Sequence, residues 1–220
     1  MRRGQGDSDR CHRSRYYGPD GKLEAEELKA LLDAASLPGP YVVVGHSLGG
    51  LNAQVFAAKY PEDVAGIVLL DPPPLSFIRG EDYTSLLAMA DQMTAQWQAV
   101  ADAGAGSADA EQKARAAFFK MIASEHREMF GESAKLVSEI SSLGDTPLLV
   151  MAAKKPNPAF EDLAQEYQQY WIEQSRRLSS KSSKGRFILA EKSTHHLYKD
   201  VPDLVFESIL SVVHQARGEK

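Results

Sequence analysis

The chain has 220 residues, of which 43% are hydrophobic and 25% charged, and its formal net charge is −5 at pH 7. This length suits one domain with a sizeable core, and the composition is ordinary for a globular protein. The mildly acidic balance gives no reason to expect nucleic acid as a partner, because nucleic-acid binders usually carry a clustered basic face.

Targeting signals are missing from the sequence as printed. No apolar stretch near residue 1 resembles a secretory signal, and no window approaches the roughly 18 apolar residues of a membrane span. Cys11 is the only cysteine, so no disulfide can form within the chain. We therefore expect a cytoplasmic protein with no membrane partner.

The first third of the chain predicts a strand–helix–strand unit. After a polar loop, residues 23–35 place leucines on one helical face. Residues 41–44 (YVVV) and 64–70 (VAGIVLL) are apolar on both faces, as expected of buried parallel strands. Residues 50–59 between them predict a helix that ends before a proline. Such a unit implies a right-handed parallel crossover.

The rest of the chain predicts a helical insertion and then more strands. Residues 75–140 have helical periodicity, interrupted by GAGSAD (104–109), so we expect two or three helices. Beyond them the pattern alternates between a strand at 147–153, a helix at 159–178, a strand at 186–190 and a helix at 201–215. The sequence predicts an α/β fold with a mostly parallel sheet, a core of residues 1–74 and 145–220, and a helical cap at 75–144.

The motif GHSLG (45–49) lies directly between the first strand and its helix. Gly-x-Ser-x-Gly in this place is typical of a nucleophile elbow, a tight turn that presents the hydroxyl of Ser47. The two glycines remove side chains that would clash in such a turn. The helix N-terminus favours developing negative charge, so the N–H of Leu48 is a natural oxyanion donor. A phosphate loop would need a lysine where Leu51 stands.

A hydroxyl nucleophile needs a base, which is usually an oriented histidine. The chain after the last strand reads STHHLYKDVP (193–202) and offers both His195 and His196. For His46, beside the nucleophile, we expect a structural role. For His126 in the cap we expect a solvated side chain.

With GHSLGG, VAGIVLLDP and a histidine loop before a proline-led helix, the chain resembles the α/β-hydrolase superfamily. The resemblance is strongest to the esterase and haloalkane-dehalogenase-like branches, although the dehalogenases carry aspartate as nucleophile. In the family, the catalytic histidine commonly follows a small residue and precedes the helix proline by seven. The resemblance therefore favours His195, which follows Thr194 and precedes Pro202, over His196.

The resemblance leaves two places for the acid of the triad. The family's usual place is the loop after the strand at 147–153, where the first acids are Glu161 and Asp162. A second known place is the end of the strand after the elbow helix, where Asp71 stands. We favour Asp71, which would fix the histidine tautomer and stabilise the imidazolium.

The resemblance also implies that part of the fold is missing. RRGQGDS (2–8) resembles the family's loop after its fourth strand, so the strands before it, and the loop that supplies a second oxyanion donor, are absent. Residues 41–44 would then form an open sheet edge, which invites pairing with another chain. We expect a fragment, an alternative start, or a chain that forms a homo-oligomer through this edge.

The sequence thus predicts a serine hydrolase that acts on a small ester or related acyl substrate through an acyl-enzyme at Ser47. It needs no cofactor, and we see no metal site. The alternative is a non-catalytic binding protein, or a remnant, on the same scaffold. Apolar cap residues would line or support a substrate pocket, and these are Leu86, Leu87, Met89, Met93, Trp97, Phe118, Phe119 and Met121.

Overall fold

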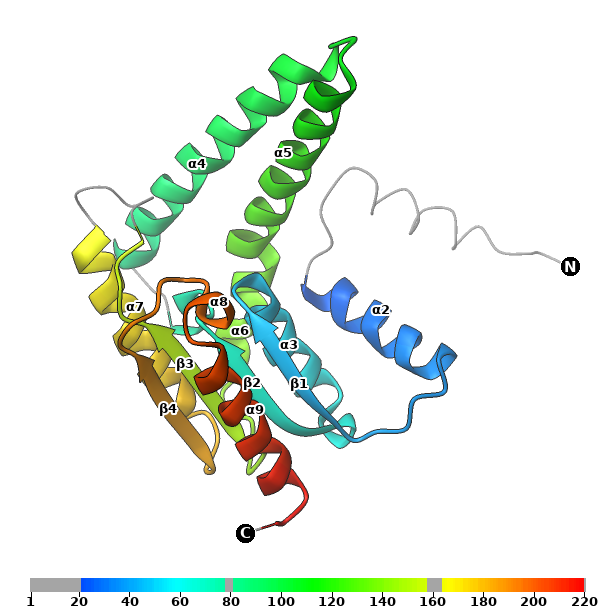
Figure 1. Ribbon diagram of the computed structural model, residues 1–220, viewed down its shortest axis with the longest axis vertical. Coiled ribbons are helices and arrows are strands. Elements are labelled where there is room, and N and C mark those ends of the chain that lie inside the picture. Colours follow the sequence, from blue (N-terminus) through cyan, green and yellow to red (C-terminus); the bar gives the residue numbers. More distant parts are fainter. Residues whose placement is uncertain (1–20, 78–80, 158–163, 220) are drawn as a thin grey trace, which may run out of the picture.

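The computed structural model describes residues 21–77, 81–157 and 164–219, and within these ranges its centre is a 4-stranded sheet (Figure 1). The strand order follows the chain, and every neighbouring pair is parallel. The strands are β1 (Tyr41–His46), β2 (Val64–Leu70), β3 (Leu148–Ala153) and β4 (Gly185–Ala190). The expected α/β fold with a parallel sheet is confirmed.

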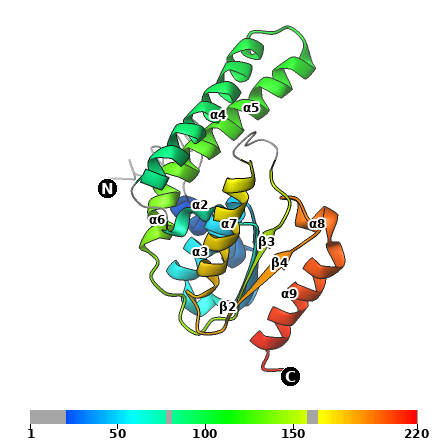
Figure 2. The ribbon, with the colours of Figure 1, turned by 90° about the vertical axis from the view of Figure 1, so that its left-hand side faces the viewer.

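Helices cover both faces of the sheet (Figure 2). On one face, α9 (Pro202–Ala216) follows the short α8 (Leu197–Asp200). On the other face lie α3 (Leu48–Lys59) and α7 (Ala164–Ser179), and α2 (Gly21–Ala34) packs on α3. This arrangement buries the central strands on both sides, which parallel sheets require.

The two faces of β2 contribute to different apolar clusters, because successive side chains of a strand point to opposite faces. Ile67 and Leu69 are fully buried in the cluster beneath α3, which includes Phe56 of that helix. Val68 and Leu70 are buried in the cluster beneath α9. The run VAGIVLL therefore has no solvent-facing side, as its composition predicts.

β1 differs from the central strands. Within the described residues it pairs only with β2, so its other edge is open, as the sequence predicts. The expectation that residues 41–44 are buried on both faces is wrong, because Val44 is 43% exposed at this edge. Formation of a homo-oligomer through the edge stays a prediction.

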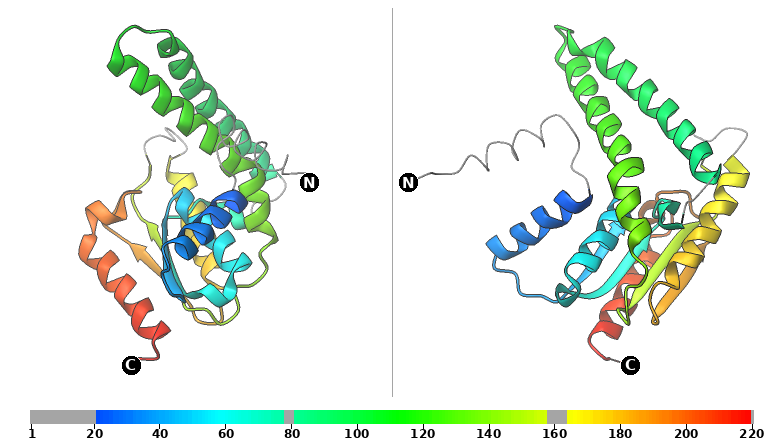
Figure 3. Two further views of the ribbon diagram at one scale, coloured as in Figure 1. Left: turned by 90° about the vertical axis from the view of Figure 1, so that its right-hand side faces the viewer. Right: turned by 180° about the vertical axis from the view of Figure 1, so that it is seen from behind.

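The insertion between β2 and β3 is dominated by a helical hairpin. Its two helices, α4 (Glu81–Ala105) and α5 (Ala110–Glu128), project together away from the sheet (Figures 1 and 3). Asp109 ends the break between them by accepting a hydrogen bond from the N–H of Gln112 at 2.8 Å, a typical N-cap. Although α4 has 25 residues, no helix in the described ranges is long and apolar enough to cross a membrane.

The hairpin returns to the sheet through a kink. A π-helical turn, η3 (Met129–Ser133), follows α5 and leads into α6 (Ala134–Glu139). Within it Gly131 leaves the helical region, with φ −91° and ψ −109°. Insertions of this kind commonly bend a helix.

The apolar residues expected to line or support a pocket differ in their exposure, and their role stays a prediction. Phe118 and Met121, near the middle of α5, are 52% and 49% exposed. Met89 does pack against the main apolar cluster. The side chain of Leu86 lies outside the described residues, and a cap with the bounds 75–144 stays a prediction.

Candidate active site

Ser47 stands at the junction of β1 and α3 with φ 53° and ψ −126°. A residue other than glycine holds such a conformation only where its surroundings impose it. The N–H of Ser47 donates to the carbonyl of Leu70 at 3.0 Å, and its own carbonyl accepts from the N–H of Gly50 at 2.8 Å. The strand–turn–helix context predicted for GHSLG is confirmed.

Close packing at this turn requires glycine at two positions. One of them, Gly45, is predicted from the sequence, and the other is Gly50 in place of the predicted Gly49. A Cβ on Gly45 would lie 2.2 Å from the carbonyl oxygen of Gly49, and a Cβ on Gly50 would lie 2.9 Å from Cβ of Pro72. A Cβ on Gly49 would meet nothing within 4 Å among the described residues. The expectation that Gly49 prevents a clash is therefore wrong, and Gly50 has that role instead.

Leu48 is the first residue of α3. The first N–H groups of a helix have no acceptor within the helix, and they carry the positive end of its dipole. The N–H of Leu48 therefore lies beside Ser47 and is free of an intrahelical acceptor. Its role as an oxyanion donor stays a prediction.

Asp71 and His195 are in direct contact, although 124 residues separate them. The Nδ1–H of His195 donates to Oδ2 of Asp71 at 2.7 Å. The other carboxylate oxygen, Oδ1, accepts from the N–H of Ala153 at 2.9 Å. The side chain of Asp71 is 4% exposed and that of His195 25%. Because both oxygens of the carboxylate are bound, its orientation is fixed, and Nε2 of His195 is left for another partner.

The backbone of Asp71 is constrained as firmly as its side chain. Its φ is 47°, and its N–H donates to the carbonyl of Met151 on β3 at 2.8 Å. Asp71 thus follows β2 in the same way that Ser47 follows β1, since His46 and Leu70 are register partners. Both residues lie at the carboxyl edge of the sheet.

The other sequence-based candidates do not reach this contact. His196 has its Nδ1 3.5 Å from the hydroxyl of Tyr198, and its imidazole does not contact Asp71. Glu161 and Asp162 lie outside the described residues. The structure therefore brings together His195 and Asp71, and it does not do so for His196.

The ring of His46 connects Ser47 to the same cluster. Its centroid lies 4.7 Å from that of His195, and Ser47 is the next residue in the chain. Among the described residues, no hydrogen bond joins the Ser47 hydroxyl to the His195 imidazole. Catalytic hydrogen bonds are often long in unliganded enzymes and shorten when substrate binds.

Two further contacts hold the loop that carries His195. The carboxylate of Asp200 accepts from the N–H of Thr194 at 2.7 Å and from its hydroxyl at 2.6 Å. These bonds lower the pKa of Asp200. From the other side, the Nε2–H of His46 donates to the main-chain carbonyl of His195 at 2.8 Å.

Sequence reasoning missed Asp200 and Trp171 as neighbours of this site. The indole ring of Trp171, on α7, stands T-shaped to the His195 ring with centroids 6.1 Å apart. Asp200 is the last residue of α8, six residues after Thr194, and an acid between this threonine and the proline-led helix is the one signal that the sequence offers. Nothing in the sequence of α7 indicates that Trp171 would reach His195.

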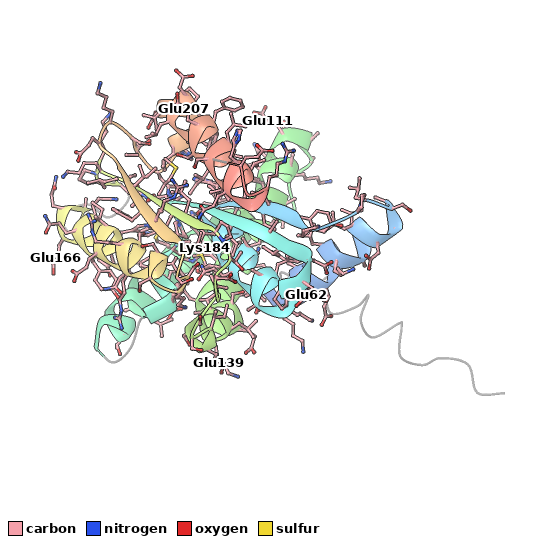
Figure 4. The ribbon with its side chains drawn as sticks, turned by 90° about the horizontal axis from the view of Figure 1, so that it is seen from below. Glu62, Glu111, Glu139, Glu166, Lys184 and Glu207 are labelled. Atoms are coloured by element: carbon pink, nitrogen blue, oxygen red, sulfur yellow. The ribbon has the colours of Figure 1, made fainter. Side chains whose placement is uncertain are left out.

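The opposite end of the sheet is built differently. A hollow of about 980 Å³ opens at the amino-terminal edge, where Glu62, Glu139 and Lys184 border it (Figure 4). Nζ of Lys184 lies 3.5 Å from Oδ2 of Asp145 there. Within the described ranges, no three His, Cys, Asp or Glu side chains are grouped to hold a metal ion at either end.

Comparisons with known proteins agree with this architecture. Residues 2–198 match the family model described as alpha/beta hydrolase fold. The uncharacterized protein YqjL of Bacillus subtilis is 26% identical over 190 residues, which are 86% of this chain and 63% of that protein. Lipase LipV of Mycobacterium tuberculosis is 58% identical over 45 residues, which are 20% of this chain and 17% of the lipase.

A solved structure of a thermophilic esterase from Thermogutta terrifontis has the same fold. Its TM-score is 0.57 at 18% identity, and the match covers 90% of this chain and 73% of that one. The chain therefore spans somewhat less than two thirds of the Bacillus relative and about three quarters of the esterase.

Proposed function

The chain belongs to the family of proteins with the α/β-hydrolase fold, and we propose that it is a serine hydrolase with Ser47 as its nucleophile. The observation that carries the proposal is the 2.7 Å contact between His195 and Asp71 at the same sheet edge as the strained turn of Ser47. A serine on a tight turn, an imidazole and a buried carboxylate are the groups that acyl transfer needs.

In the first half of the proposed reaction, Nε2 of His195 takes the hydroxyl proton of Ser47 while Oγ attacks the carbonyl carbon of an ester. Asp71 stabilises the imidazolium that forms and holds its tautomer. The carbonyl oxygen becomes an oxyanion, which accepts a hydrogen bond from the N–H of Leu48. The carbon–oxygen bond to the alcohol then breaks, and His195 gives its proton to the departing alkoxide.

In the second half, water replaces the alcohol. His195 takes a proton from the water as its oxygen attacks the acyl-enzyme carbonyl. The bond to Oγ of Ser47 breaks, the proton returns to Oγ, and a carboxylic acid leaves. No oxidant, metal or cofactor enters this balance.

An ester is the substrate class that the relatives favour. LipV is named a lipase, and the Thermogutta structure is that of an esterase. The similarity to LipV covers only 45 residues, so it supports the class of bond and not the length of the acyl chain. We place residues 75–144, with the α4–α5 hairpin, over the site as its cap.

A fluorophosphonate probe tests the proposal, because it phosphonylates activated serines. We expect labelling of the wild-type chain and none of Ser47→Ala. Ser138→Ala, which removes an exposed hydroxyl on α6, is the matched control and should label like the wild type. Equal labelling of Ser47→Ala would place the reactive group elsewhere. A folded wild-type chain that fails to label would favour a non-catalytic binding protein.

A further inference from the structure

His46 is the one side chain described here that ties the strand of the elbow to the main chain of the histidine loop. It ends β1 and directly precedes Ser47. Its Nε2–H donates to the carbonyl of His195 at 2.8 Å across 149 residues of sequence. The backbone positions of the proposed nucleophile and base are thus connected through a single imidazole.

The ring of His46 is also enclosed by aromatic neighbours. Its centroid lies 4.7 Å from the ring of His195 at an interplanar angle of 44°. The ring of Tyr198 stands at right angles to it, with centroids 5.2 Å apart. Rings packed on two sides fix the direction of the Nε2–H, so the hydrogen bond to the loop has little freedom to move.

The chemistry of His46 suits a fixed donor and not a second base. Burial lowers the pKa of His46, so its ring is neutral near pH 7. A neutral ring with its proton on Nε2 donates to the carbonyl without placing a positive charge beside His195. The imidazolium that acyl transfer creates at His195 therefore meets no like charge from this neighbour.

We infer that His46 is a positioning residue, which sets the separation of Ser47 and the His195 imidazole by holding the His195 carbonyl. The inference rests on the proposed hydrolase function and adds a residue to its machinery. Asp200 holds the loop at Thr194 from the solvent side, and it makes no link to β1. Loss of the His46 bond removes this link between the loop and β1, and the main chain of His195 then shifts relative to Ser47.

Three substitutions at position 46 separate the hydrogen bond from the packing. Glutamine carries an amide N–H at nearly the same reach as Nε2 of histidine. Asparagine is one carbon shorter and falls short of the His195 carbonyl. Leucine fills the space and donates nothing. His214→Leu is the matched control, because it makes the same change at a half-exposed histidine of α9 that pairs with Glu219.

The measurements are kcat and KM for p-nitrophenyl butyrate and the rate of fluorophosphonate labelling. We expect His46→Leu and His46→Asn to lower kcat by about tenfold to hundredfold with KM little changed, since small misplacement of reacting groups has effects of this size. His46→Gln should stay within about threefold of the wild type, and His214→Leu should be unchanged. In a His195→Ala background, adding His46→Leu should cost less than about threefold, because His46 acts through His195.

The outcomes distinguish this inference from the proposed function. If Ser47→Ala still labels, the proposed function fails. If Ser47→Ala does not label but His46→Leu keeps the wild-type kcat, only the inference is overturned. Equal losses in His46→Gln and His46→Leu, or full additivity with His195→Ala, would also overturn it. Should His46→Leu fail to fold, the comparison of His46→Asn with His46→Gln decides the matter.

Discussion

Two histidines in different regions of the molecule each contact a side-chain oxygen through Nδ1, but one is suited to proton transfer and the other to packing. At the carboxyl edge of the sheet, Nδ1 of His195 lies 2.7 Å from a carboxylate oxygen of Asp71. In the α4–α5 hairpin, Nδ1 of His126 lies 2.9 Å from the hydroxyl of Thr94. The ring of Trp97 stands T-shaped to His126, with centroids 4.9 Å apart.

The difference between the partners decides what each ring can do. A carboxylate stabilises an imidazolium, so the ring of His195 can gain a proton and return it. A hydroxyl carries no charge, and burial lowers the pKa of His126 to about 4. Although Asp91 opposes this shift, His126 is neutral near pH 7 and serves as a packing residue. The expectation that His126 is solvated is wrong, because it is half-buried between the two helices of the hairpin.

The largest effect should come from changing the partner of His195. Asp71→Asn keeps an oxygen for the N–H of Ala153 but places an amide against Nδ1, which forces the wrong tautomer. By analogy with the triads of serine proteases, we expect kcat to fall by about 10⁴-fold. Thr94→Val makes the equivalent change at His126 and should leave kcat unaltered. Comparable activity of the two variants in an ester assay would show that Asp71 is not the acid.

A change at the other histidine should alter stability and leave chemistry intact. His126→Ala removes a ring that packs against Trp97 and against Phe130, whose centroid is 4.9 Å away. We expect the free energy of unfolding to fall by about 1–3 kcal/mol, while fluorophosphonate labelling of the folded chain keeps its rate. Urea titration followed by circular dichroism measures the first quantity. A loss of labelling without a loss of stability would contradict the division between the two regions.

The same comparison predicts a pH dependence. The pKa of His126 is about 4 in the folded chain and 6.5, the ordinary histidine value, in the unfolded chain, so below pH 6.5 the unfolded chain binds the extra proton first. Stability from this group is therefore complete above pH 6.5 and is lost as the pH falls toward 4. Allowing for partial exposure of the ring, the loss is at most about 2 kcal/mol.

His126→Gln provides the control for this dependence, because an amide does not titrate. Melting temperatures at pH 7 and pH 4.5 should differ less in His126→Gln than in the wild type. Identical pH dependence in the two proteins would mean that another group causes the acid sensitivity.

The smallest effect belongs to the hydrogen bond in the hairpin. Thr94→Val replaces a hydroxyl by a methyl group of similar size and leaves Nδ1 of His126 without this partner. We expect a loss of about 1 kcal/mol in the free energy of unfolding, the usual net worth of a neutral hydrogen bond. If Thr94→Val lowered the free energy of unfolding as much as His126→Ala, the stabilisation would come from the hydrogen bond between Thr94 and His126 and not from packing of the His126 ring.

Local pattern was sufficient to predict the elements but not the packing between them. The run at 64–70 forms β2 with the same bounds, because an apolar run of that length between turn residues has few alternatives as a parallel strand. The exposure of Val44 depends on what lies beside the sheet edge, which no window of sequence contains. Likewise, the need for glycine at position 50 depends on Pro72, which follows the next strand.

The site shows the same division. Ser47 follows from its motif and the order of elements around it, and both are local. The choice of His195 over His196 depends on a family resemblance, namely the spacing from the histidine to the helix proline. Two adjacent histidines lie in the same local sequence, so local pattern alone does not distinguish them. The pairing of His126 with Thr94 joins two helices across the hairpin and leaves no signal in either one. Side-chain contacts between different helices and strands could not be predicted from the sequence.

The three hydrogen bonds made by Asp71 give this residue two separate roles, one structural and one at the proposed active site. One oxygen and the backbone N–H fasten β2 to β3, while the other oxygen faces His195. Truncation to alanine keeps the backbone bond to Met151 but removes the carboxylate's bond to Ala153 together with the contact to His195, so the variant loses a structural bond as well as the reactive one. An inactive but correctly folded variant, suited to trapping a bound ester for crystallography, is better made by substituting Ser47.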